Sequence, residues 1–271
     1  MKTNLSVIMG AYNCGSTLTD SVKSILNQTY EDFLCYICDD GSIDNTWEVI
    51  QNLAKEDKRI IPLQNEKNSG LSHSLNKCIE VCDSKYIARM DGDDIAEPNR
   101  FEVQVGFMES HPEIDFSGAA IRYFDNNGFW GNHIYPKNPK AEDFLFTSPF
   151  NHPTVIYRAD CLKKIKDIDG YIYSESPKIG RSEDYDLFMR MHAAGLKSYN
   201  IQEPLLQYRE DLDSFAKRKF KYAVTEARVR WRNFRKLKLL PKGFLYVIKP
   251  LIVSLVPKPI RRYLHKKQYK R

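Results

Sequence analysis

The feature of this sequence that most limits its fold is a regular alternation of short apolar runs with segments of helical periodicity in its first hundred residues. The apolar runs cover 5–9, 33–38, 60–63 and 86–90. Between them apolar residues recur at intervals of three or four, as in Leu18, Val22 and Ile25. Strands separated by helices are typical of crossover units, in which neighbouring strands run parallel. We therefore predict an α/β fold with a mostly parallel sheet flanked by helices.

Beyond residue 100 the pattern is less regular. We expect a helix at 98–108, a strand at 116–124 and another helix at 184–194, which Gly195 would end. The stretch 129–180 is rich in Pro, Asn and aromatic residues and has few long periodic segments. We expect it to be mostly loop and to form one wall of a binding site, since loops on a rigid scaffold often carry functional residues.

The formal net charge of +6 conceals two regions of opposite charge. Residues 217–271 hold 19 of the 41 Lys and Arg residues and one of the 35 Asp and Glu residues, so this segment carries +18 and residues 1–216 carry −12. The 271 residues, of which 42% are hydrophobic, suffice for one large domain with an appendage. We therefore predict an acidic domain at 1–216 and a basic helical tail at 217–271.

Two groups of carboxylates directly follow predicted strands: Asp39-Asp40 after the second apolar run and Asp91-Gly92-Asp93-Asp94 after the fourth. In open α/β sheets, ligands bind at the carboxyl ends of the strands. Five carboxylates at one edge repel each other unless a hard divalent cation lies between them, so the pattern indicates a metal-bridged diphosphate. The alternative is a turn and helix cap, which explains the first group equally well. It explains the second less well, because a cap needs only one acid.

A further acidic pair, Glu183-Asp184, opens the last helix expected in the acidic domain. The structural explanation is that the helix dipole favours acids at a helix N-terminus. The functional explanation is that Asp184 acts as a general base and takes a proton from an attacking hydroxyl. This role requires the fold to place the pair opposite the metal.

Taken together, the motifs resemble those of family 2 glycosyltransferases of the GT-A fold. In chain order they are 6–13, 24–30, 39–42, 68–70 with Asn76, 91–94 and 183–185. The resemblance extends from about residue 4 to residue 210. It implies a Rossmann-like sheet and an inverting, Mn²⁺- or Mg²⁺-dependent enzyme. Such an enzyme moves a sugar from a nucleotide sugar, usually a UDP sugar, to a hydroxyl of a saccharide acceptor.

The resemblance also implies roles for individual residues. Ala11 and Tyr12 would line the pocket for the base, and Asp40 would form a hydrogen bond with the uracil ring. In the Asp-x-Asp motif, Asp93 would bind the metal, and Asp91 would contact the ribose or the metal. Further contacts to the nucleotide sugar are expected from Asn76, Arg89, Gly92, Glu183 and Arg209.

The chemistry of sugar transfer agrees with these residues. Inversion needs a deprotonated hydroxyl that attacks the anomeric carbon while the diphosphate leaves from the opposite face. A divalent cation neutralises the charge of the leaving group, and Asp184, which matches the catalytic base of the family, would take the proton. No covalent nucleophile is required.

The segment 151–158, followed by 169–171, is similar to bacterial enzymes that make β-1,3 linkages in surface polysaccharides such as O-antigen, capsule or lipopolysaccharide. Within it, His152 is either an acceptor-binding residue or a loop histidine that caps backbone groups. The chain departs from the family at 208–211, where relatives often have Tyr-Arg-x-His and this sequence has Tyr-Arg-Glu-Asp. A histidine ligand from this loop is therefore not expected, and Arg209 is left to contact the diphosphate.

The basic segment 217–271 mixes Lys and Arg with aromatic and aliphatic residues, and in its first helix we expect Phe220, Trp231 and Phe234 on a face apart from the basic residues. Its apolar run at 244–260 is interrupted by Lys249, Pro250 and Pro257, so it is too short to span a bilayer. We expect the segment to lie on an anionic membrane surface, which suits a lipid-linked acceptor, and its removal to release the protein from membranes. The alternative is a solvated basic helix that packs on the acidic domain. Nucleic-acid binding is not expected, because no groove-reading module is recognised.

The N-terminus shows no apolar core or cleavage site of a signal peptide, so we expect a cytoplasmic protein that is peripheral on the inner face of the cell membrane. Two other functions compete with sugar transfer. A phosphatase of the haloacid-dehalogenase type carries its Asp-x-Asp motif on the first strand, whereas here the first apolar run leads into residues 10–13. A catalytically degenerate, membrane-bound adaptor is opposed by the intact set of Asp40, Asp93 and Asp184.

Overall fold

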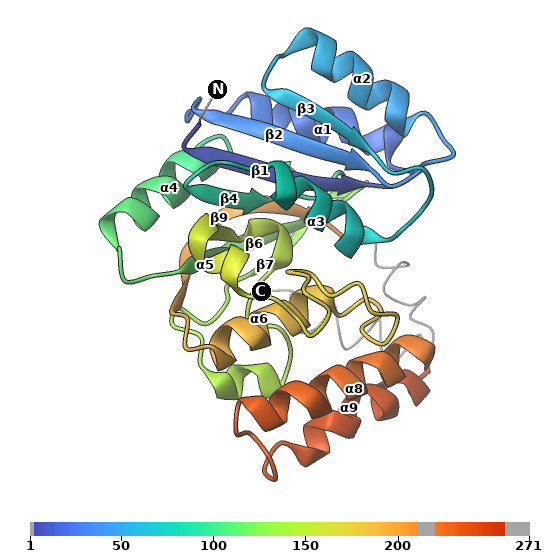
Figure 1. Ribbon diagram of the computed structural model, residues 1–271, viewed down its shortest axis with the longest axis vertical. Coiled ribbons are helices and arrows are strands. Elements are labelled where there is room, and N and C mark those ends of the chain that lie inside the picture. The colour runs from blue at the N-terminus through green and yellow to red at the C-terminus, as the bar shows by residue number, and fades with distance from the viewer. Residues whose placement is uncertain (1–2, 211–219, 258–271) are drawn as a thin grey trace.

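The computed structural model describes residues 3–210 and 220–257, and a nine-stranded sheet runs through them (Figure 1). The strand order is β3-β2-β1-β4-β8-β6-β9-β5, and β7 pairs with β6. Residues 211–219 and 258–271, which include part of the predicted basic tail and Asp211 of the 208–211 motif, lie outside the described residues.

The first half of the sheet is wholly parallel, as the alternation predicts. Its strands are β1 (Leu5–Ala11), β2 (Phe33–Asp39), β3 (Ile60–Gln64) and β4 (Tyr86–Arg89). The helices between them are α1 (Gly15–Leu26), α2 (Thr46–Glu56) and α3 (Leu71–Val81). Because side chains of a strand alternate between faces, Val7 packs with α1 and α2 on one face and Ile8 packs with α3 on the other. Burial on both faces explains why these strands are continuously apolar.

The second half of the sheet is mixed. Its strands are β5 (Ile95–Ala96), β6 (Phe116–Asp125), β7 (Gly128–His133), β8 (Ile156–Arg158) and β9 (Ser198–Arg209). β9 runs parallel to β6, whereas β8 runs antiparallel to both of its neighbours, β4 and β6. The accompanying helices are α4 (Arg100–Ser110), α5 (Ala159–Lys164) and α6 (Glu183–Ala193). The α/β class with flanking helices is therefore confirmed, and β8 joins the two halves.

The stretch 129–180 is mostly loop, as expected, but it also contains short elements. Besides β7, β8 and α5 these are two 3₁₀ helices, η1 (Ala141–Leu145) and η2 (His152–Thr154). The three-residue strand β8 lies in the middle of the sheet, and it follows η2 after one residue. The segment 151–155 is thereby fixed next to the end of β4, where the acidic motif begins.

The described part of the basic segment folds into two helices that pack on the acidic domain. They are α8 (Phe220–Lys236) and α9 (Phe244–Leu255), which form a helical hairpin beside α6 (Figure 1). Val229, Phe234 and Val247 belong to the same buried cluster as Tyr185 and Phe188 of α6. For 220–257 the structure therefore agrees with the alternative in which a basic helix packs on the domain, and the boundary at 216 stays a prediction.

This packing corrects two details of the sequence interpretation. Phe234 and Arg230 are buried on the inner side of α8, while Phe220 and Trp231 are exposed, so the aromatic residues do not share one face. Removal of 217–271 would expose the core of the domain and is therefore not a clean test of membrane binding. No helix among the described residues is both long enough and apolar enough to cross a membrane.

Candidate active site

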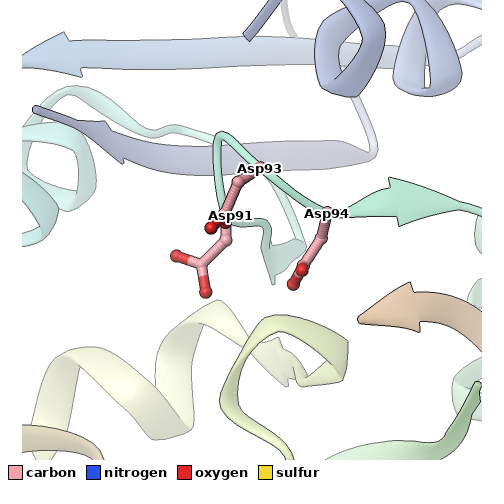
Figure 2. Close-up of side chains that lie close together, drawn as sticks. All are labelled: Asp91, Asp93 and Asp94. Atoms are coloured by element: carbon pink, nitrogen blue, oxygen red, sulfur yellow. The ribbon is translucent and has the colours of Figure 1, made fainter. Parts of the chain in front are cut away.

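Three carboxylates meet on the turn between β4 and β5. Figure 2 shows Asp91, Asp93 and Asp94 at the carboxyl end of the parallel half of the sheet. One oxygen from each of the three lies within 4.8 Å of the others. The sequence predicts Asp91 and Asp93 as metal ligands, and the structure adds Asp94 to the cluster.

Side chains of α1 hold this turn in place. The hydroxyl of Thr17 donates to the carbonyl of Gly92 at 2.9 Å, and the hydroxyl of Ser21 donates to the carbonyl of Asp91 at 2.7 Å. A Cβ on Gly92 would lie 3.0 Å from the sulfur of Cys14, just before α1, so a larger residue here would require the side chain of Cys14 to shift. In this structure Gly92 is buried and serves packing, and its predicted contact to the nucleotide sugar stays a prediction.

The cluster carries more negative charge than the protein around it balances. The pKa of Asp93 is raised to about 6 by partial desolvation of its carboxylate and by the charge of Asp91, although the residue is exposed. Burial and the charges of Asp91 and Asp93 raise the pKa of Asp94 well above its usual value. The Oδ2 atom of Asp94 has no hydrogen-bond partner among the described residues. Crowded carboxylates with an unused oxygen fit a hard divalent cation such as Mn²⁺ or Mg²⁺.

Arg89, the last residue of β4, lies beneath the cluster and forms an ion pair with Asp91. Its side chain is only 2% exposed, and its Nε and Nη1 atoms have no hydrogen-bond partner in the described part of the chain. Because Arg89 is buried and paired with Asp91, its direct contact with the nucleotide sugar stays a prediction. The contacts of Arg89 in this structure are those of a buried counter-charge to the acids.

Arg209, at the end of β9, borders the cluster on its other side. Its backbone N–H donates to Oδ1 of Asp94 at 2.8 Å, and its Nε donates to the carbonyl of Asp93 at 3.0 Å. Its guanidinium lies 4.4 Å from the ring centroid of Phe124 and is half-buried. The structure thus places this cation next to the acidic turn, as the proposed contact to a diphosphate requires.

The residues predicted for the base pocket lie where β1 and β2 end. Ala11 is buried, and the following Tyr12 is 45% exposed. The carboxylate of Asp40 is 4% exposed and accepts hydrogen bonds from the side chain of Asn65 and from the backbone N–H groups of Ser69 and Gly70, at 2.8–2.9 Å. Asp40 therefore fixes the loop after β3, and its predicted bond to uracil needs the acceptor capacity that remains.

Glu183 and Asp184 form the first turn of α6, opposite the acidic cluster. The pKa of Glu183 is raised to about 7, chiefly by burial and next by the adjacent Asp184. Arg89 lowers this pKa and Asp91 raises it further, so the charges of the two sites act on each other. The charge of Asp91 acts on Glu183, so the acid pair lies within electrostatic range of the Asp-x-Asp motif, and the role of Asp184 as the base stays a prediction.

Two predicted site residues are engaged with a segment that the sequence interpretation overlooked. The side chain of Asn76 donates to the carbonyl of Tyr173 and to Glu175 at 2.8–2.9 Å, and its oxygen accepts from the N–H of Tyr173. The Nε2 atom of His152 lies 2.7 Å from the hydroxyl of Tyr173. Burial and the charge of Arg89 keep the pKa of His152 well below its usual value, so this histidine is neutral.

Tyr173 is therefore the residue that the sequence reasoning missed. Its buried hydroxyl contacts His152 and lies 3.4 Å from the hydroxyl of Tyr157. Burial raises the pKa of this hydroxyl, on which the charges of Arg89 and Asp184 also act. A single tyrosine in an aromatic-rich loop carries no periodic or motif signal. Asp94 could have been included, since it stands in the same acidic run as Asp91.

We predict that Glu183→Gln stabilises the protein at alkaline pH. Because the folded pKa of Glu183 is about 7 and its ordinary value is 4.5, its contribution to stability is present below 4.5 and is lost as pH rises through 7. At pH 8 the variant should melt higher, by about 2–4 °C for each kcal/mol of relieved repulsion. The difference should shrink at pH 5. Glu48→Gln, an exposed acid in the first turn of α2, is the control. Equal melting temperatures of wild type and Glu183→Gln at pH 8 would contradict the prediction.

Comparison with known proteins agrees with this geometry. The sequence profile described as Glycosyl transferase family 2 matches residues 6–165, more than half of the chain. EpsE of Bacillus subtilis, a protein named as a glycosyltransferase, is 37% identical over 265 residues, which cover 97% of this chain and 94% of EpsE.

A second relative carries a more specific name. The UDP-Glc:α-D-GlcNAc-diphosphoundecaprenol β-1,3-glucosyltransferase WfaP of Escherichia coli is 30% identical over 233 residues, 83% of this chain and 84% of WfaP. The crystal structure of residues 1–349 of TarS from S. aureus in complex with UDP-GlcNAc aligns with a TM-score of 0.72 at 15% identity, over 97% of this chain and 79% of the TarS 1–349 chain, and so shows the same fold. The chain belongs to glycosyl transferase family 2 and is a glycosyltransferase of the GT-A fold.

Proposed function

We propose that this glycosyltransferase moves a sugar, with inversion, from a UDP sugar to a hydroxyl of a lipid-linked saccharide acceptor in bacterial surface-polysaccharide synthesis. The observation that carries the proposal is the position of Glu183 and Asp184 opposite the Asp-x-Asp motif. The name of WfaP supports a UDP donor, a diphosphate-linked lipid acceptor and a β-1,3 linkage.

In the proposed mechanism Asp184 takes the proton from the attacking hydroxyl of the acceptor. Asp91 and Asp93, with Asp94 behind them, would hold the divalent cation, which neutralises the charge of the diphosphate when it is bound. Arg209 adds a cation on the other side of the turn. Burial and the charges of Asp184 and Asp91 raise the pKa of the neighbouring Glu183 to about 7.

The protein also orients the donor and the acceptor. Tyr12 and Ala11 would form the wall against which the base stacks, and Asp40 would use its remaining acceptor capacity for the uracil ring. On the acceptor side, His152 holds the hydroxyl of Tyr173, so we assign it an indirect part in shaping that wall. Fixed positions of this kind lower the barrier by reducing the entropy that must be lost during the reaction.

We predict that Asp184→Asn lowers kcat by 10²–10⁴-fold, the usual range for removal of a general base, while UDP binding is retained. The amide keeps the size of the side chain but cannot take the proton. Transfer from a panel of UDP sugars and calorimetric binding of UDP would measure the two effects. Asp160→Asn, the same substitution in the first turn of α5 on an exposed acid, should behave as wild type.

Two results would count against this mechanism. Unchanged turnover in Asp184→Asn would remove Asp184 from the reaction. A wild-type protein that hydrolyses and transfers none of the UDP sugars in the presence of Mn²⁺ would favour the rival function, a degenerate membrane-bound adaptor with a transferase fold.

We predict that Mn²⁺ together with UDP raises the melting temperature of the wild type and that Asp93→Asn removes most of this rise. A ligand at 100 times its Kd stabilises the folded state by about 2.7 kcal/mol, and the variant loses a ligand of the cation. Scanning calorimetry with Mn²⁺, with Mg²⁺ and with EDTA measures the effect. Asp160→Asn should keep the full rise. A rise of equal size in Asp93→Asn would exclude Asp93 as a ligand.

We further propose that the outer surface of α8 and α9 binds an anionic membrane. Exposed apolar side chains gather there, including Phe220, Trp231, Phe244 and Ile252. Phe220 and Trp231, together with Val224 and Leu251, border a groove of about 410 Å³. The exposed cations of the hairpin include Lys221, Arg228, Lys236 and Lys242. Aromatic groups flanked by Lys and Arg are the composition that binds at lipid headgroups.

We predict that Trp231→Ser combined with Phe244→Ser weakens binding to vesicles of phosphatidylglycerol and phosphatidylcholine by about tenfold or more, since each ring buries apolar area at the interface. The two rings are in edge contact, with centroids 6.3 Å apart. Vesicle flotation measures the binding. The control is Phe129→Ser, an exposed aromatic on β7 away from the hairpin. Equal binding of the double variant and the control would contradict the membrane proposal.

A further inference from the structure

Helix α8 touches the chain immediately before the catalytic acid pair. Gly180 adopts a φ of +61°, and a Cβ on it would lie 2.7 Å from the hydroxyl oxygen of Thr225. The guanidinium of the next residue, Arg181, lies 5.0 Å from the ring centroid of Tyr222. The segment that leads into α6 therefore rests directly on α8.

The same helix touches the chain immediately after the acid pair. The guanidinium of Arg230 lies 5.0 Å from the ring centroid of Tyr185. The side chain of Asn233 donates to the carboxylate of Asp186 at 2.7 Å, and Arg232 forms an ion pair with the same carboxylate. Contacts to α8 thus bracket Glu183 and Asp184 on both sides along the chain.

Asp186 makes the polar contacts that tie the first turn of α6 to α8. Its carboxylate is fully buried and, besides the two groups of α8, accepts only from Nε of Arg190, at 2.8 Å, among the described contacts. Arg190 in turn donates to the carbonyls of Ile165 and Ile172, which lie in the loop before α6. A buried carboxylate is tolerated only while its partners remain, so the first turn of α6 depends on donors that α8 supplies.

We propose that Arg232 and Asn233 are positioning residues of the transferase, which act through Asp186 to fix the carboxylate of Asp184 relative to the acceptor. This inference rests on the proposed function, and it makes α8 a part of the catalytic apparatus rather than a separable anchor. The backbone N–H of Asp186 donates to the carbonyl of Ser182 at 2.9 Å, so Asp186 closes the helical turn that contains Asp184. A shift of Asp186 moves that turn.

The test compares Arg232→Met with Arg235→Met in the full-length chain. Arg235 lies on the same helix, is exposed and carries the same charge, so its loss matches the change in net charge. We expect Arg232→Met to lower kcat at least tenfold while KM for the UDP sugar and the affinity for UDP stay within twofold of wild type. Asn233→Leu should act in the same direction. Arg232→Lys, which keeps the cation, should recover part of kcat.

Amide hydrogen exchange in 180–187 gives a second readout that does not depend on turnover. We expect faster exchange there in Arg232→Met than in Arg235→Met, at a temperature where both are folded. If Arg232→Met does not fold, Arg232→Lys and Asn233→Leu take its place in both measurements.

The outcomes separate this inference from the proposed function. Slower turnover with faster local exchange supports the positioning role. Unchanged kcat in Arg232→Met overturns it, and so does a lower kcat without a change in exchange, because the loss then has another cause. If the wild type transfers no sugar at all, the proposed function fails. The exchange of 180–187 then decides on its own whether α8 fixes this turn.

Discussion

The repulsion among carboxylates at the end of β4 is the constraint to which the rest of the site is adapted. Asp91, Asp93 and Asp94 are close enough for one cation to contact all three carboxylates. The acid pair of α6 lies within electrostatic range of them. Desolvation and, after it, the charges of neighbouring carboxylates raise the pKa values of Asp93 and Glu183. Arg89 beneath them and Arg209 beside them offset only a part of this charge. A divalent cation would offset more of it, and in the proposed function the same cation also neutralises the diphosphate of the donor.

The parallel half of the fold could be predicted because its strands are buried on both faces. Runs such as 33–38 are then continuously apolar and contrast clearly with the amphipathic helices between them. The mixed half carries no such contrast. β8 has only three residues, and its partners β4 and β6 are distant from it in the sequence. Its place in the centre of the sheet therefore depends on tertiary contacts that no local pattern encodes. The packing of the hairpin of α8 and α9 could not be predicted either, because the sequence shows the charge of the segment but not which arginines point inward.

The candidate site shows the same division. Asp91, Asp93 and Asp184 belong to acidic groups that contain more carboxylates than a turn or a helix cap needs, and the structure brings these groups together. Asn76 and His152 are neutral polar residues, whose partners cannot be read from their neighbours in sequence, and both hold the segment at Tyr173. The role of Asp40 is intermediate. Its burial beneath the loop after β3 was not expected, while its place beside the predicted base pocket agrees with the motif.

The link between Asp186 and the α8 residues Arg232 and Asn233 joins positions 46 and 47 residues apart in the chain. In a lineage of related enzymes, the C-terminal segment would then not be inherited as an independent module. A recombination event that exchanged this segment alone would leave the buried carboxylate of Asp186 without its partners on α8. Such exchanges would survive only if positions 186, 232 and 233 were exchanged together, so the C-terminal segment and the rest of the domain should share one evolutionary history.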